Sequence, residues 1–305
     1  MSTKQPSPTS GINQVPVVIA WIVTLFISTL PLIIWRESTG QAPEWLYWVQ
    51  LALLGVMIGL SFVWKLLSAL RQFFIVFFML YLAEKVFVWL GNSSLWQSWF
   101  DNDAFTISML GTQLLRLGVA LVMVATLWLI KRQRSDFFLV RGNINAPVEP
   151  IKWLGVKEGT HWNRFGPILS ICISLGTLAF LIFFGRPSLT SLIQALPLFP
   201  AVLLLACMNS FSEEMNYRAS QLAVLHGVLS NRQAILLTAA YFGIGHYYGV
   251  PYGIIGVLMA GILGWLLGKS MLETKGFFWA WFIHFLQDVL IFSFMAIGSI
   301  AVGGG

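Results

Sequence analysis

The chain alternates long apolar runs with short polar interruptions. A helix of about 20 apolar residues crosses roughly 30 Å of hydrocarbon. Runs of this length lie near 15–35, 45–64, 72–90, 107–130, 166–184, 191–212, 233–250, 252–268 and 277–297. Of the 305 residues, 57% are hydrophobic and 10% are charged, whereas soluble domains have about 25% charged residues. We therefore expect an all-α, polytopic transmembrane helical bundle of about eight membrane helices.

One polar segment divides this pattern in two. Residues 131–165 carry seven Lys or Arg, whereas the loop 91–106 carries only two acidic residues and no basic one. Basic loops stay on the cytoplasmic side of a membrane. We expect an N-terminal four-helix membrane region at 1–130, a cytoplasmic connecting segment at 131–165 and a catalytic membrane domain at 166–305. The N-terminus should also be cytoplasmic, and the host membrane a bacterial inner membrane.

Charge and cysteine content narrow the function further. The net charge of +6 is explained by cytoplasmic loops, so it indicates the lipid bilayer as a partner and no nucleic acid. Cys172 and Cys207 lie in apolar runs without the spacing of a zinc site. The chain has neither the His-Glu-x-x-His motif of zinc proteases nor the Gly-x-Ser-Gly motif of serine intramembrane proteases.

Two adjacent carboxylates, Glu213 and Glu214, interrupt one of the most apolar stretches. A charge at the bilayer centre costs about 2.5–3.5 kcal/mol or more, so such groups are retained where partners or a wet cavity receive them. Arg218 is four residues after Glu214, on the same helix face, whereas Glu213 faces about 100° away. The pattern favours a supporting Glu214–Arg218 ion pair and a Glu213 free for chemistry. A purely structural ion cluster remains the alternative.

Two later apolar runs also carry polar groups at helical spacing. Phe242 and His246 are four residues apart, and so are His284 and Asp288. Counted from the nearest basic turns at about 1.5 Å per residue, Glu213, His246 and Asp288 all lie about 20 Å from the cytoplasmic boundary. The sequence therefore predicts one shared cavity among the C-terminal helices.

Glu84 and Arg116 of the N-terminal half fall at a similar level, about 20–22 Å by the same count. We expect Arg116 to pair with Glu84 or to neutralise the carboxylates of the C-terminal half. Because the cavity would hold carboxylates and imidazoles, it suits the activation of water. A poorly solvated carboxylate can take a proton from water near neutral pH, and an imidazole can orient that water.

The ordered motifs Glu213-Glu214-x-x-x-Arg218, Phe242-x-x-x-His246 and His284-x-x-x-Asp288 resemble those of the CPBP family of intramembrane proteases. This family includes the CAAX prenyl endoproteases and the bacteriocin-processing or immunity (Abi) proteins. The resemblance covers roughly residues 150–300, and the N-terminal half has no recognised counterpart.

The resemblance implies that Glu213 and His246 activate the attacking water, and that His284 and Asp288 line the oxyanion side. It leaves Glu214 and Arg218 as a supporting ion pair, with Phe242 as a packing residue. The family commonly has Asn where this chain has Asp288, and an ionised Asp can accept hydrogen bonds but not donate them. Asp288 is therefore either protonated or bound to His284, or it has another role.

The leading hypothesis is an intramembrane endopeptidase of the glutamic type. It would need no cofactor and would act on a membrane-anchored or lipidated protein or peptide. A metal-dependent hydrolase using His246, His284 and a glutamate is a second possibility. The third is a non-catalytic immunity or scaffold protein, or a proton-coupled transporter, of the same fold.

Overall fold

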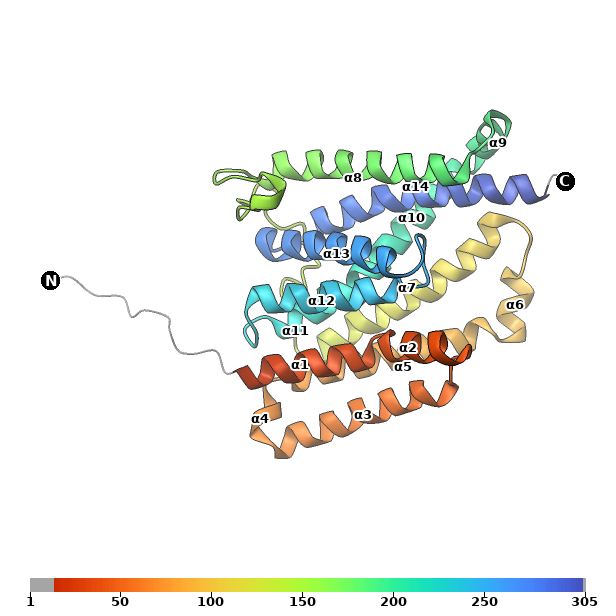
Figure 1. The fold of residues 1–305 in the computed structure, drawn as a ribbon. Coiled ribbons are helices and arrows are strands. Elements are labelled where there is room, and N and C mark those ends of the chain that lie inside the picture. The colour runs from red at the N-terminus through yellow and green to blue at the C-terminus, as the bar shows by residue number, and fades with distance from the viewer. Residues whose placement is uncertain (1–13, 304–305) are drawn as a thin grey trace.

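The computed structural model describes residues 14–303, and these residues form a bundle of helices without strands (Figure 1). The N-terminal helices are α1 (Gln14–Ile27), α2 (Leu30–Thr39), α3 (Glu44–Val63), α4 (Lys65–Ser68), α5 (Arg71–Gly91), α6 (Ser94–Phe100) and α7 (Phe105–Leu129). The C-terminal elements are α8 (Trp162–Gly185), α9 (Leu189–Ala195), α10 (Phe199–Glu214), a π-helical turn (Met215–Ala219), α11 (Ser220–Leu225), α12 (Asn231–Gly245), α13 (Ile254–Thr274) and α14 (Phe278–Gly303).

Seven helices in this part of the chain are long and apolar enough to cross a membrane, or eight if α1 and α2 form one span. The prediction of an all-α polytopic membrane bundle is thus confirmed. Helix α7 ends at Leu129 and α8 begins at Trp162, with a short 3₁₀ turn at Lys152–Leu154 between them. The division into 1–130, 131–165 and 166–305 stays a prediction.

The run 15–35, expected to be one helix, is broken into α1 and α2, which meet at an angle of 43°. Pro31 lies in the first turn of α2 and has no backbone N–H to continue the hydrogen bonding of α1. The hydroxyl of Ser28 accepts from the backbone N–H of Leu30, and the hydroxyl of Thr29 donates to the carbonyl of Ile244. The side chain of Gln50 on α3 donates to the carbonyls of Phe26 and Ser28, so the break is held by α3 as well as by the end of α12.

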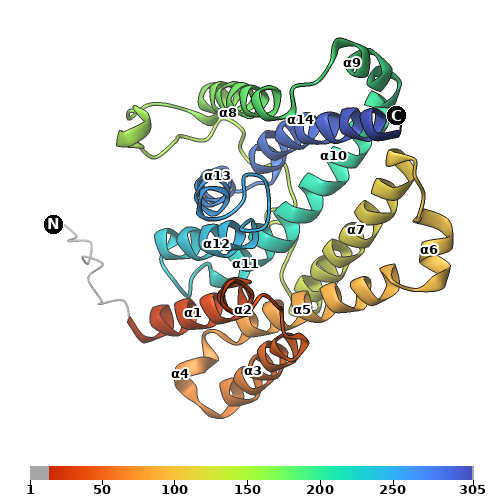
Figure 2. The same cartoon turned by 45° about the vertical axis from the view of Figure 1, so that its right-hand side comes forward.

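Helix α10, which carries the glutamate pair, lies between the two halves of the bundle (Figure 2). It packs against α14 on one side and against α7 on the other. Helix α12 packs against α13, and Gly243 permits this contact because a Cβ there would lie 2.6 Å from the carbonyl oxygen of Val257. Small residues allow membrane helices to approach closely in this way.

The polar segment docks against the junction of α13 and α14. The backbone N–H of Asn143 donates to the carbonyl of Thr274, and Trp162 donates its indole N–H to Glu273 over 2.7 Å. Glu273 also forms an ion pair with Lys269, whose side chain is 7% exposed. These bonds fix the start of α14 and hence the height of the residues it carries.

Candidate active site

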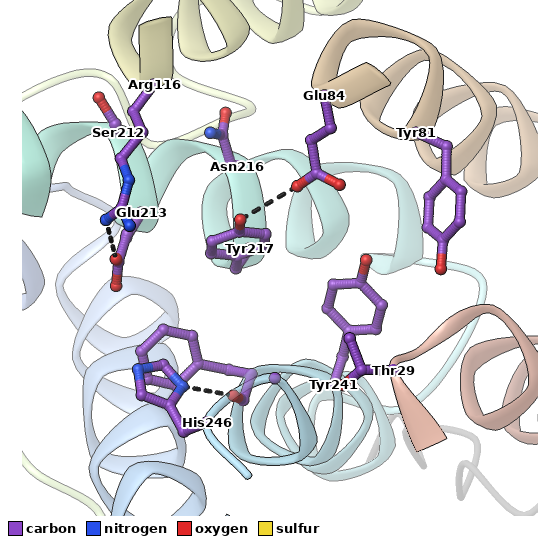
Figure 3. Close-up of a pocket in the computed structure, with 12 residues that line it drawn as sticks. Thr29, Tyr81, Glu84, Arg116, Ser212, Glu213, Asn216, Tyr217, Tyr241 and His246 are labelled. Atoms are coloured by element: carbon purple, nitrogen blue, oxygen red, sulfur yellow. Dashed lines mark hydrogen bonds and ion pairs between the residues drawn. The ribbon is translucent and has the colours of Figure 1, made fainter. Parts of the chain in front are cut away.

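A cavity of about 340 Å³ lies between the two halves of the molecule (Figure 3). It is within the range of small-ligand pockets, about 300–1,000 Å³. The residues that line it are Thr29, Tyr81, Glu84, Arg116, Ser212, Glu213, Asn216, Tyr217, Tyr241, Phe242, Gly245 and His246. The cavity therefore takes walls from α5, α7 and the α1–α2 break as well as from the C-terminal helices.

The glutamate pair closes α10, and the chain continues in a wide π-helical turn before α11 begins. Such turns insert one extra residue and are frequent at functional sites. Here the turn supplies Asn216 and Tyr217 to the cavity, while Arg218 points into the protein and is fully buried. One short segment thus provides both the cavity wall and its buried support.

Glu214 is fully buried and serves as the centre of that support. It forms the predicted ion pair with Arg218, and its Oε1 also lies 2.6 Å from Nδ1 of His284. The guanidinium carbon of Arg218 lies 3.9 Å from the centre of the Phe242 ring, which is a cation–π distance. These contacts join α10, α12 and α14 behind the cavity, with Glu214 paired to Arg218.

Glu213 lines the cavity, and its side chain is 15% exposed. Its Oε1 is 3.0 Å from Nη1 of Arg116 and 3.3 Å from Nδ2 of Asn209, while its Oε2 is 3.5 Å from Nε2 of His284. The expectation that Arg116 neutralises a C-terminal carboxylate is confirmed, and Glu213 is the one it reaches. Glu213 is consequently held in place rather than left free.

Asn209 was not singled out from the sequence. It accepts from Arg116 over 2.5 Å, and it lies four residues before Glu213, one helical turn away. That spacing, an amide one turn before a buried carboxylate on the same face, was the available signal.

His246 follows the last turn of α12 and faces the same cavity as Glu213. Its Nδ1 lies 2.8 Å from the carbonyl of Phe242, which can only accept, so Nδ1 carries the hydrogen. In the neutral ring Nε2 therefore keeps its lone pair. The centres of the Phe242 and His246 rings are 4.3 Å apart, so Phe242 packs against His246.

His284 and Asp288 lie behind Glu213, 5% and 4% exposed, and outside the set that lines the cavity. Nε2 of His284 is 3.7 Å from Oδ1 of Asp288, and Asn209 donates to Oδ2 of Asp288 over 3.0 Å. Asp288 is thus beside His284, one of the roles considered for it. That these residues stabilise an oxyanion stays a prediction.

The opposite end of the cavity carries a second carboxylate. Glu84 of α5 accepts a hydrogen bond from the hydroxyl of Tyr217 over 3.0 Å, and Tyr81 and Tyr241 line the same end (Figure 3). The depth count placed Glu84 at this level, but nothing in the sequence pointed to the tyrosines.

The described residues include no group of three or more His, Cys, Asp or Glu side chains that could hold a metal ion.

The fold and cavity define an integral membrane protein that brings a carboxylate and an imidazole to one cavity large enough for a small ligand. Residues 194–290 match the family described as type II CAAX prenyl endopeptidase Rce1-like. This part of the chain is similar to Rce1-like domains, in agreement with the CPBP family that the three motifs resemble. Comparison with curated proteins and with solved structures gave no match.

Proposed function

We propose that the protein is an intramembrane endopeptidase that cleaves a peptide bond of a membrane-anchored or lipidated protein, using water activated by Glu213 and His246. The observation that carries this proposal is that both side chains line one cavity and both belong to the segment that matches the CAAX-protease family. Glu213 can accept a proton, and Nε2 of His246 offers a lone pair to the same space.

The reaction follows from these two acceptors. A water molecule donates one hydrogen to Glu213 and the other to His246, and its oxygen attacks the carbonyl carbon of the substrate while Glu213 takes the first proton. A tetrahedral oxyanion results. When the C–N bond breaks, protonated Glu213 returns its proton to the departing amine nitrogen. The attacking oxygen stays in the new carboxyl group, and Nε2 of His246 accepts that group's remaining proton, so that a carboxylate leaves and His246 later passes the proton to solvent.

Arg116 is our candidate for stabilising the oxyanion. Its side chain is 48% exposed and lines the cavity, so some of its five N–H donors are available beyond those that bind Glu213 and Asn209. A positioned cationic donor in a poorly solvated site stabilises developing negative charge. In this mechanism His284 contacts Glu213 from the side away from the cavity and helps to position it. Glu214, which is paired with Arg218, holds His284 in place.

The setting of the reaction is also part of the proposal. We place the protein in a bacterial inner membrane with the N-terminus and residues 131–165 on the cytoplasmic side, and the distribution of basic residues supports this orientation.

The test uses the purified full-length protein in lipid vesicles with prenylated, C-terminally extended reporter peptides. Glu213→Gln keeps the shape of the side chain but cannot take a proton, so cleavage should fall by about 10²-fold or more. Glu158→Gln, an exposed position on the polar segment, is the matched control and should cleave normally. Full activity of folded Glu213→Gln would reject the mechanism.

A parallel measurement compares membrane proteomes of cells that carry wild-type protein or Glu213→Gln. A substrate should accumulate uncleaved only with the variant. Treating the purified enzyme with a chelator separates the two hydrolytic mechanisms, because the glutamic mechanism predicts unchanged cleavage. Loss of activity that a divalent ion restores would support metal dependence instead.

A further inference from the structure

We propose that the end of the cavity around Glu84 is a subsite for a cationic side chain of the substrate, a lysine or an arginine next to the bond that is cleaved. This proposal rests on the proposed function, since it assumes a peptide in the cavity. It assigns a role to a residue of α5, which lies outside the matched domain 194–290.

The charges of the residues that line the cavity favour a cation at Glu84. Among the described residues that line it, Glu84 and Glu213 are acidic and Arg116 is basic, which leaves one unbalanced negative charge when both carboxylates are ionised and His246 is neutral. Arg116 forms its ion pair with Glu213. Within the described chain Glu84 has no cation at ion-pair distance, and its hydrogen-bond partner is the neutral hydroxyl of Tyr217. A cation bound at Glu84 would balance the cavity.

Aromatic rings surround this carboxylate. Tyr217 and Tyr241 have ring centres 6.1 Å apart, and Tyr81 lines the same end, as Figure 3 shows. The face of an aromatic ring attracts an ammonium or guanidinium group, the more so where water is scarce. A carboxylate among tyrosine rings is a binding environment for an organic cation with an apolar stem.

An unpartnered acceptor points to a missing donor. Asn216 is 4% exposed and lines the cavity between Glu213 and Glu84, and its Oδ1 has no hydrogen-bond partner among the described residues. A buried oxygen left without a donor is costly, so such an atom indicates a partner that the protein alone does not supply. A lysine carries three donors and an arginine five, so a cation bound to Glu84 would keep donors for a second acceptor such as Asn216.

The first experiment measures binding without catalysis. The probe is n-butylamine, protonated at neutral pH and equal to a lysine side chain, with n-butanol as its uncharged counterpart; saturation-transfer NMR on the solubilised full-length protein gives the affinities. Wild type should bind the amine at least about tenfold more tightly than the alcohol, and Glu84→Gln should lose this difference. Equal binding of the amine by wild type and Glu84→Gln overturns the subsite.

A second variant covers the case in which Glu84→Gln does not fold. Asn216→Asp adds a carboxylate to the same end of the cavity and should tighten amine binding severalfold. If it leaves amine binding unchanged, the proposed contact between the cation and Asn216 is wrong.

The second experiment uses pairs of reporter peptides with lysine or norleucine on each side of the cleaved bond. Wild type should show kcat/KM about tenfold or more higher for one lysine peptide, and Glu84→Gln should lose this preference while still cleaving the norleucine peptide. Equal cleavage of both peptides by wild type contradicts the subsite but not the endopeptidase. Absence of all cleavage contradicts the endopeptidase, and the amine-binding result then decides whether a cation site exists.

Discussion

Removing the guanidinium of Arg218, a residue that does not itself line the cavity, should destabilise the protein strongly. Arg218 and Glu214 are both fully buried, and they pair one helical turn apart. In Arg218→Met the methionine fills part of the volume, but Glu214 is left as a buried carboxylate whose remaining polar contact is Nδ1 of His284. Most of the expected loss in the free energy of unfolding comes from this uncompensated buried charge.

Breaking a buried ion pair by removing one partner costs about 3–5 kcal/mol. The contact between the guanidinium and the ring of Phe242 adds a smaller loss, up to about 2 kcal/mol when desolvated. Since every 1.4 kcal/mol is a factor of ten, the pair alone corresponds to a change of about 10²- to 10³-fold or more in the unfolding equilibrium. The double variant Glu214→Gln with Arg218→Met removes both charges and should recover much of this loss.

The assay is unfolding of the wild type, both single variants and the double variant by denaturing detergent, followed by tryptophan fluorescence and combined as a double-mutant cycle. Glu213→Gln serves as a control that alters a neighbouring carboxylate without breaking this pair. A stability of Arg218→Met within about 1 kcal/mol of wild type would refute the reasoning, because a surface pair is worth no more than that. So would a double variant as unstable as the sum of the two single variants.

Three further outcomes test other parts of the site. Gly243→Ala should cost about 1–3 kcal/mol by forcing α12 from α13, whereas Gly176→Ala, whose Cβ meets nothing within 4 Å, should be neutral or slightly stabilising in thermal unfolding. Arg116→Met should lower kcat about 10²- to 10³-fold, with Arg116→Lys intermediate, if its donors stabilise the oxyanion; an unchanged kcat would remove it from the mechanism. Asp288→Asn should unfold within about 1 kcal/mol of wild type and keep its cleavage rate, because the amide oxygen still accepts from Asn209; loss of cleavage in the folded variant would show that the charge is needed.

The parts of the site that the sequence predicted are those that follow from helical spacing and from the cost of buried charge. The Glu214–Arg218 pair follows from four-residue spacing, and the meeting of Glu213, His246 and Arg116 at one cavity agrees with the count of residues from the basic turns. The length of the apolar runs likewise predicted the all-α membrane bundle, because a single segment in lipid can satisfy all of its backbone hydrogen bonds only as a helix.

Details that depend on packing between helices were beyond the sequence. The rotation of α5 and α7 about their axes decides that Arg116 reaches Glu213 and not Glu84, and apolar runs with few polar residues leave that rotation undetermined. The π-helical turn after Glu214 shifts every later side chain on α11 relative to regular helical spacing. Pro31 is a signal for a break at Ser28 and Thr29. The hydrogen bond from Thr29 to Ile244 joins distant parts of the chain, so the local sequence does not predict it.

The state of Glu213 depends on both halves of the molecule. The matched domain supplies Glu213, Asn209 and His284, but the cation that balances Glu213 comes from α7. Without Arg116 the carboxylate would be held by a neutral amide and an imidazole in a poorly solvated site, where its ionised form is costly. The N-terminal half, which has no counterpart in the family resemblance, therefore contributes, together with His284, to the charge of the group that we propose takes the proton from water.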